Sequence, residues 1–174
     1  MTRPDPSEHA PYYSRYIDLV PDGDVLRTLA AQGKETRALL ASVPPERETY
    51  RYAPGKWSLR QVVGHLIDTE RLFAFRSLWF ARGAASPLPG MEQDEWARVS
   101  NAGDRALEEL REEWAAARRD TLALLGGYDD EAWARTGVAS DNPISVRACA
   151  WIIAGHELWH QRGLARDYGL GAEG

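Results

Sequence analysis

The segment that decides the fold runs from Val146 to Tyr168 and reads VRACAWIIAGHELWHQRGLARDY. Apolar and histidine side chains recur along it at steps of three and four residues, which is the period of one face of an α-helix. The series consists of Val146, Cys149, Ile152 or Ile153, His156 and His160. Ser145 stands directly before the segment and can cap its first turn. The segment therefore predicts a long helix whose core-facing stripe carries two histidines.

Three further segments have helical periodicity and end at helix-breaking residues. They span residues 24–43, 58–83 and 107–126. Pro44 and Pro45 end the first of them, because proline cannot continue a helix. Ser58 with Gln61 has the form of a capping box at the start of the second. Together with the C-terminal helix, these segments predict an all-α four-helix bundle.

The remaining residues connect the helices or precede them. Residues 1–22 form a polar, proline-bearing arm with several tyrosines, which we expect to pack on the body. Residues 84–103 are interpreted as a long crossover loop with a short helix over 93–99, and one more helical turn is expected over 129–134. Sustained alternation of apolar and polar residues is missing, so no strand is predicted. The predicted organisation is the arm followed by a single domain over residues 23–170.

Composition limits the classes of partner and the compartment. The chain has 174 residues, with 21 Lys and Arg against 26 Asp and Glu, a formal net charge of −5. The basic residues are scattered, so we expect no nucleic-acid partner. The single cysteine, Cys149, cannot form an internal disulfide, and the longest apolar run is far shorter than the roughly 18 residues that span a bilayer. We therefore expect a cytoplasmic protein without membrane insertion.

The chemistry is predicted to lie at the pair His156 and His160. Residues four apart lie on the same side of a helix, about 6 Å apart along its axis, so two imidazoles can reach one metal ion. Such a spacing also arises by chance or as a surface pair. Here both rings project from the core-facing stripe, where unpartnered imidazoles are costly and a metal would satisfy both.

A third ligand is predicted upstream, at His65 in the second helix. Alone, a histidine beside apolar neighbours is more often a hydrogen-bonded core residue than a ligand. With His156 and His160 it completes a three-nitrogen set contributed by facing helices. Catalytic zinc sites have three protein ligands and one open position. The remaining histidine, His9 in the polar arm, is interpreted as solvated.

The same segment spells H-E-x-x-H, the zinc-peptidase signature in which the glutamate is the general base. The extended motif requires a third histidine where this chain has Arg166, and arginine stays protonated and cannot bind the metal. The peptidase interpretation is therefore disfavoured.

Two acidic residues near the predicted ligands are candidates for supporting roles. Glu157 could orient a water or act as a general base, which makes it the candidate catalytic residue. The alternative, slightly favoured, is a surface carboxylate paired with an arginine such as Arg162. Glu70 lies about 140° around the helix from His65, so an ion pair inside the bundle is expected instead of ligation. Cys149 is expected to be a small core residue.

Four short strings, in this order, resemble the DinB/YfiT-like superfamily. They are APGKWS at 53–58, GHLIDTER at 64–71, PLPG at 87–90 and IAGHELWH at 153–160. The resemblance implies an up-down-down-up four-helix bundle, often a homodimer, that binds one divalent metal, commonly zinc or nickel. The family's three histidines fall on His65, His156 and His160. Many relatives carry a further histidine where this chain has Gln161.

The resemblance also suggests a set of functions. Characterised members include low-molecular-weight thiol S-transferases and thiol-dependent isomerases, while others are induced by DNA damage and have no demonstrated reaction. Our leading hypothesis is a metal-dependent S-transferase that uses a bacillithiol- or mycothiol-type thiol on a small-molecule substrate. The alternatives are a metal-dependent hydrolase and a metal-binding stress protein without turnover.

Overall fold

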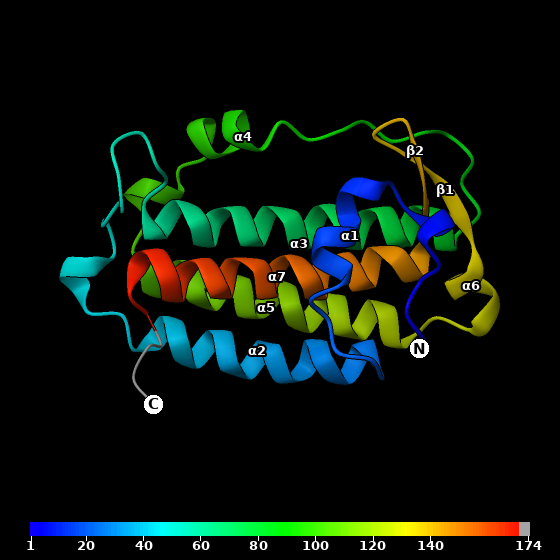
Figure 1. Cartoon of the computed structure of the whole chain (residues 1–174), viewed down its shortest axis with the longest axis horizontal. Coiled ribbons are helices and arrows are strands. Elements are labelled where there is room, and N and C mark those ends of the chain that lie inside the picture. The colour runs from blue at the N-terminus through cyan, green and yellow to red at the C-terminus, as the bar shows by residue number, and fades with distance from the viewer. Residues whose placement is uncertain (171–174) are drawn as a thin grey trace.

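The computed structural model describes residues 1–170, and its body is a bundle of four long helices (Figure 1). These are α2 (Val25–Ala41), α3 (Leu59–Ala81), α5 (Leu107–Gly126) and α7 (Val146–Tyr168). Helices α2 and α3 each pack against both α5 and α7, so they occupy opposite corners of the bundle. The chain runs in one direction along α3 and α5 and in the other along α2 and α7. This is the predicted up-down-down-up order.

Local capping explains where the long helices begin and end. The side chain of Asp24 accepts a hydrogen bond from the backbone of Leu26 at the start of α2. Ser58 and Gln61 form the predicted capping box of α3, and Ser145 caps α7. Gly169, with a left-handed φ of 65°, follows the last residue of α7 and ends it. The four predicted helices are therefore confirmed to within about two residues at each end.

Short helices fill the connections. They are α1 (Ser14–Ile17), α4 (Gln93–Val99) and α6 (Asp130–Ala134), together with the 3-10 turns Pro6–Glu8, Pro11–Tyr13, Pro45–Arg47 and Ala102–Asp104. The predictions of a short helix within the crossover and of a helical turn before the last helix are both confirmed. In Figure 1 the crossover passes along one edge of the bundle, with α4 near one end.

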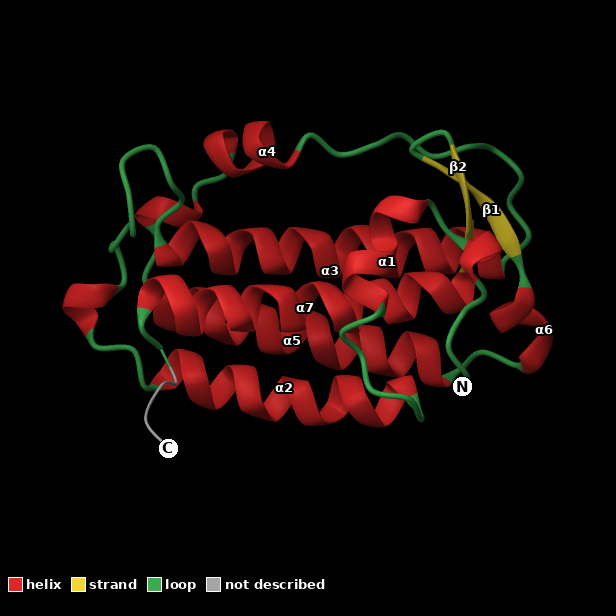
Figure 2. Ribbon diagram, viewed as in Figure 1, coloured by secondary structure: helices red, strands yellow, loops and turns green. Residues whose placement is uncertain are grey.

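The prediction that the chain has no strand is wrong. An antiparallel hairpin, β1 (Thr136–Ala139) and β2 (Asn142–Ser145), leads into α7 (Figure 2). Each strand has four residues, too few for alternation to emerge, and β2 contains Pro143. The turn of the hairpin consists of Ser140 and Asp141, which both have positive φ values. Glycine usually marks such a turn in a sequence, and it is missing here.

The N-terminal arm packs against the body as expected. Tyr16, Ile17 and Val20 are buried, and α1 contacts α7. Gly155 of α7 permits this contact, because a Cβ there would lie 2.1 Å from the backbone oxygen of Tyr16. The interpretation of His9 as solvated is wrong. It is only 5% exposed, and its Nδ1 is hydrogen-bonded to the Ala10 carbonyl, because the arm folds back on itself and on the body.

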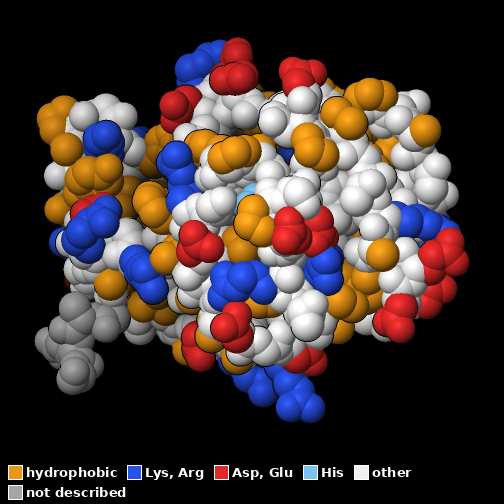
Figure 3. All heavy atoms as spheres, turned by 45° about the vertical axis from the view of Figure 1, so that its right-hand side comes forward, with side chains coloured by type: hydrophobic (Ala, Val, Ile, Leu, Met, Phe, Trp, Pro, Cys, Tyr) orange, Lys and Arg blue, Asp and Glu red, His pale blue; other side chains and the backbone are white. Residues whose placement is uncertain are grey.

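The surface carries charges of both signs. On the face drawn in Figure 3, basic and acidic side chains are interspersed among apolar and neutral ones. Within residues 1–170, none of the helices combines the length and the apolar content needed to cross a bilayer.

Candidate metal centre

The structure brings the three predicted histidines together between α3 and α7. The Nε2 atom of His156 lies 3.0 Å from Nε2 of His65 and 3.2 Å from Nε2 of His160. Each residue offers one nitrogen, and these atoms all lie within 4.8 Å of one another. His65 and His156 are buried, and His160 is partly buried. We call this group the three-histidine cluster.

The protonation of the cluster suits a metal ion. Burial lowers the pKa of His65 to about 4 and that of His160 to about 3, and it places the pKa of His156 well below its ordinary value. All three rings are therefore neutral near pH 7. A neutral ring nitrogen has either one hydrogen or one lone pair, so Nε2 of His156 can make a good hydrogen bond to only one of its two neighbours. A divalent cation would accept a lone pair from all three.

Aromatic side chains surround the cluster and limit how its rings can turn. The ring of Trp57 lies 4.8 Å from that of His65, centroid to centroid, and the ring of Tyr16 lies 5.3 Å from that of His156. Tyr16 in turn contacts Trp159. Apolar walls of this kind hold ligand rings in place and restrict the access of water.

A second polar cluster lies beside the first and faces another part of the core. The Arg118 guanidinium on α5 donates two hydrogen bonds of 2.7 Å to the Glu70 carboxylate and one of 2.6 Å to Glu157. The other oxygen of Glu157 accepts a hydrogen bond from the Thr36 hydroxyl, and Arg118 also donates to the Leu29 carbonyl. All three charged side chains are buried. We call Glu70, Arg118 and Glu157 the Arg118 network.

This network settles two expectations from the sequence. The buried ion pair expected for Glu70 is confirmed. The interpretation of Glu157 as a surface carboxylate paired with Arg162 is wrong, since Glu157 is 2% exposed and pairs with Arg118. Burial raises the pKa of Glu157, although Arg118 opposes that shift. Its role as a catalytic base stays a prediction, and both of its oxygens already accept hydrogen bonds within the core.

Arg118 was not singled out from the sequence, although a signal for it exists. Trp114 and Thr121 belong to the apolar stripe of α5 and are seven residues apart. Arg118 occupies the intervening position at helical spacing, so it faces the core, and an arginine there requires a buried acidic partner. Cys149, in contrast, is a core residue as expected. It is fully buried, and burial raises the pKa of its thiol to about 12.

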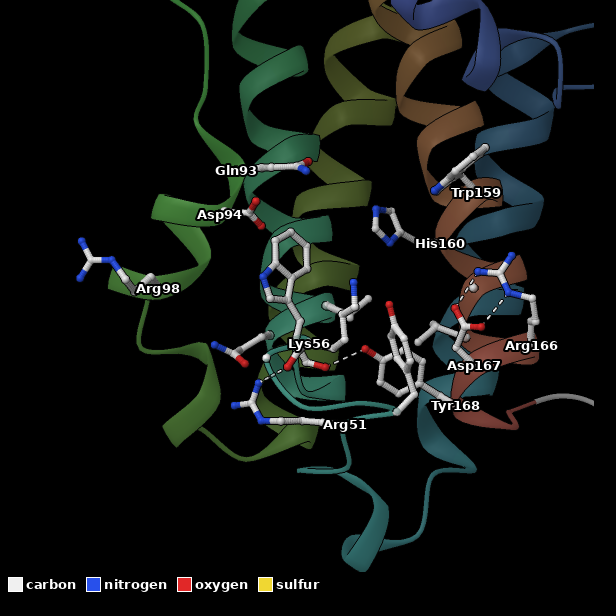
Figure 4. Close-up of a pocket in the computed structure, with 17 residues that line it drawn as sticks. Arg51, Lys56, Gln93, Asp94, Arg98, Trp159, His160, Arg166, Asp167 and Tyr168 are labelled. Carbon is white, nitrogen blue, oxygen red and sulfur yellow. Dashed lines mark hydrogen bonds and ion pairs between the residues drawn. The ribbon is translucent and has the colours of Figure 1, made fainter.

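Two cavities reach the three-histidine cluster from different sides. The first, which we call the His160 cleft, has a volume of about 630 Å³ and lies between the loop before α3, α4 and the last turns of α7. Figure 4 shows Gln93 and Asp94 on α4 across this cleft from Trp159 and His160 on α7.

The second cavity, which we call the aromatic pocket, has a volume of about 330 Å³. His65 and His156 line it, together with Tyr12, Tyr13, Tyr16 and Phe73. Gln93 and Asp94, at the start of α4, line both cavities. The three-histidine cluster therefore lines both cavities, through His160 in the cleft and through His65 and His156 in the pocket.

Solved structures with the same fold were found. YfiT from Bacillus subtilis, described as a probable metal-dependent hydrolase with an unusual four-helix bundle topology, superposes with a TM-score of 0.69. It is 18% identical, and the match covers 95% of this chain and 93% of YfiT. A mycothiol-dependent maleylpyruvate isomerase superposes with a TM-score of 0.70 at 13% identity, over 90% of this chain and 64% of the isomerase. At these identities the likeness shows the fold alone.

The sequence itself shows which family the chain belongs to. No protein of curated function matches the sequence. The model of the DinB superfamily matches residues 28–163, which include all of α3 and α5, most of α2 and α7, and all three histidines of the cluster. The chain belongs to the DinB superfamily.

Proposed function

We propose that this protein is a metal-dependent enzyme that transfers a low-molecular-weight thiol, of the mycothiol or bacillithiol type, to an electrophilic small molecule. The observation that carries the proposal is the position of three neutral histidines between two cavities, one lined by His160 and the other by His65 and His156. Two cavities at one donor set suit a reaction of two small molecules. The mycothiol dependence of the isomerase with the same fold supports a thiol as one of them.

The donor set fits a divalent ion, with zinc and nickel the expected metals. Such an ion, held by His65, His156 and His160, would supply a Lewis acid that lowers the pKa of a thiol or a water. Structural zinc sites normally have four protein ligands, whereas the group in residues 1–170 that could hold an ion comprises three. This favours a reactive site over a purely structural one, and therefore an enzyme over a metal-binding stress protein without turnover.

The His160 cleft suits the thiol. Its lining includes the cationic side chains of Arg51, Lys56, Arg98 and Arg166 and the acidic side chains of Asp94 and Asp167. Asp167 already pairs with Arg166, and Arg98 pairs with Glu95. Arg51 and Lys56 then outnumber Asp94, so an excess of positive charge remains for the carboxylates that low-molecular-weight thiols commonly carry. The half-exposed Trp159 adds an apolar surface beside His160.

The test is the rate of conjugation with and without a thiol. With 1-chloro-2,4-dinitrobenzene as the probe, the thiol sulfur forms a bond to the ring carbon, chloride leaves, and the thiol proton passes to the buffer. Protein loaded with zinc or nickel should turn over only when a low-molecular-weight thiol is added, and His160→Ala should lose that activity. A wild-type protein that shows no thiol-dependent conjugation with any of several electrophiles would overturn the proposal.

Metal-dependent hydrolysis is the second candidate, favoured by the description of YfiT. It needs a water in place of the thiol at the same three-histidine cluster. Full turnover of an ester or amide substrate in the absence of any thiol, lost in His160→Ala, would select this alternative.

A further inference from the structure

The aromatic pocket contains a buried arginine that lacks an acidic partner. Arg76 of α3 is 1% exposed and lines the pocket. Its hydrogen bonds all come from Nη2, which donates to the Pro89 carbonyl at 2.8 Å and to the Ser140 hydroxyl at 3.1 Å. Within residues 1–170, no carboxylate pairs with this guanidinium, and its Nε atom has no hydrogen-bond partner.

Arg76 differs from Arg118, which is also buried, in having no carboxylate partner. Arg118 has two carboxylates at 2.6 to 2.7 Å and a carbonyl as partners. Arg76 has only neutral oxygens, although removing a guanidinium from water without a counter-charge is costly. A charge left uncompensated at the wall of a cavity is compensated when an anion binds there.

A second unsatisfied polar group lies on the same side of α3. Thr69 is 2% exposed, lines the pocket, and its hydroxyl has no hydrogen-bond partner. His65, Thr69, Phe73 and Arg76 follow one another at steps of four, four and three, which places all of them on one face of the helix.

The spacing along α3 places His65 and Arg76 at opposite ends of the pocket. The helix rise places the Cα atoms of His65 and Arg76 about 16 Å apart. Helical side chains tilt toward the N-terminus, so the long side chain of Arg76 reaches back toward His65 and shortens this span. Its guanidinium carbon accordingly lies 5.0 Å from the centroid of the Phe73 ring. Between the two ends, Tyr13, Tyr16 and Phe73 supply an apolar wall.

We propose that the aromatic pocket binds a small carboxylate with an apolar or aromatic body. The carboxylate pairs with Arg76 and accepts a hydrogen bond from Thr69, and the opposite end of the molecule lies against His65 and His156. The exposed Glu92 and Asp94 also line the pocket and disfavour molecules with a second negative charge. The inference rests on the proposed function only in identifying this molecule as the electrophilic substrate, because binding itself needs neither thiol nor turnover.

The experiment measures binding, by calorimetry, of 4-phenylbutyrate and of its neutral analogue 4-phenylbutanol to the full-length protein, with and without zinc. We expect the carboxylate to bind at least about ten-fold more tightly than the alcohol. Arg76→Met should remove that preference, and Thr69→Val should weaken carboxylate binding several-fold. The matched control is Arg71→Met, an exposed arginine on the same helix, which should leave binding unchanged.

Several outcomes would overturn the proposal. They are equal binding of acid and alcohol to the wild type, an unchanged preference in a folded Arg76→Met, or an equal loss in Arg71→Met. If Arg76→Met does not fold, Thr69→Val decides, and unchanged carboxylate binding there contradicts the proposal. Carboxylate binding without thiol-dependent conjugation would refute the transferase and leave this site standing. Conjugation without any preference for a carboxylate would refute this site alone.

Discussion

Two buried polar clusters lie side by side in this bundle and are built on opposite principles. His156 and Glu157 are neighbours in α7, yet a helical turn of about 100° per residue sends one to the three-histidine cluster and the other to the Arg118 network. In the network every carboxylate oxygen accepts a hydrogen bond from a core donor. In the cluster, Nε2 of His156 lies near the Nε2 atoms of both other histidines but can form a good hydrogen bond to only one of them.

This difference indicates that the Arg118 network has a structural role and that the three-histidine cluster has a ligand-binding role. A buried polar group that is fully satisfied joins helices, whereas an unsatisfied group at the wall of a cavity can be completed by a ligand. The network joins α3, α5 and α7, and the hydrogen bond from Thr36 to Glu157 adds α2. We propose that the histidines, like Arg76 and Thr69, take their partners from outside the chain.

The largest expected effect comes from breaking the network. Arg118→Met leaves two buried carboxylates without their counter-charge, so we expect the free energy of unfolding to fall by about 3–5 kcal/mol. Urea denaturation followed by circular dichroism measures the loss. Changing Glu70 and Glu157 to glutamine in the same protein should restore part of the stability. A single variant as stable as the wild type would show that the network does not hold the helices together.

The next largest effect comes from filling the cluster. A ligand that binds only the folded state at 100 times its dissociation constant stabilises a protein by about 2.7 kcal/mol. Zinc or nickel added to the chelator-treated wild type should therefore raise the melting temperature, and a chelator should reverse the change. The same additions to His160→Ala should have little effect. An equal shift in that variant would place the bound metal elsewhere.

The contribution of a single histidine ring to the pH dependence of the metal-free protein should be a smaller effect. Unfolded histidine has a pKa of about 6.5, whereas burial lowers the pKa of His65 to about 4 and that of His160 to about 3. Between these values the unfolded chain binds more protons, so the contribution of each ring is complete above about pH 6.5 and is lost as the pH falls toward the folded pKa.

Urea titrations of the metal-free protein at about pH 7.5 and about pH 5 measure this contribution. We expect a loss on the order of 2 kcal/mol for each ring at the lower pH, and His65→Gln should remove its share because glutamine does not titrate. An identical pH dependence in wild type and variant would mean that His65 does not titrate as its burial requires.

The smallest effect is expected from an exposed ion pair. Arg37 and Glu112 join α2 to α5 at 3.0 Å, but both side chains are about half exposed. Surface pairs contribute about 0–1 kcal/mol because water and salt screen them. Arg37→Ala should change the urea midpoint only slightly. A loss as large as that of Arg118→Met would remove the contrast between buried and exposed pairs.

The sequence predicted those features that depend on local signals. The capping box at Ser58, the paired prolines after α2 and the stripe of α7 are local, and the long helices begin and end close to where these signals place them. His156 and His160 were predicted for the same reason, because their four-residue spacing lies on the core-facing stripe of a single segment. Predicting His65 as the third ligand required one further assumption, that its helix faces the helix with the histidine pair.

The features that the sequence did not predict depend on contacts between distant segments. The hairpin before α7 has strands of four residues each and a turn without glycine. His9 is buried by the packing of the arm, and the partner of Glu157 lies 39 residues away, on α5. The unpaired state of Arg76 can be recognised only when its surroundings are known, because arginine alone does not show whether a carboxylate lies nearby.

The most direct test of the central claim is the metal content of the protein. The untagged protein, purified without a chelating column and dialysed against zinc or nickel, should contain about one ion per chain by elemental analysis. The variant with both His65→Ala and His160→Ala should contain essentially none. A wild type without bound metal, or a double variant with the same content, would contradict the assignment of His65, His156 and His160 as the metal ligands.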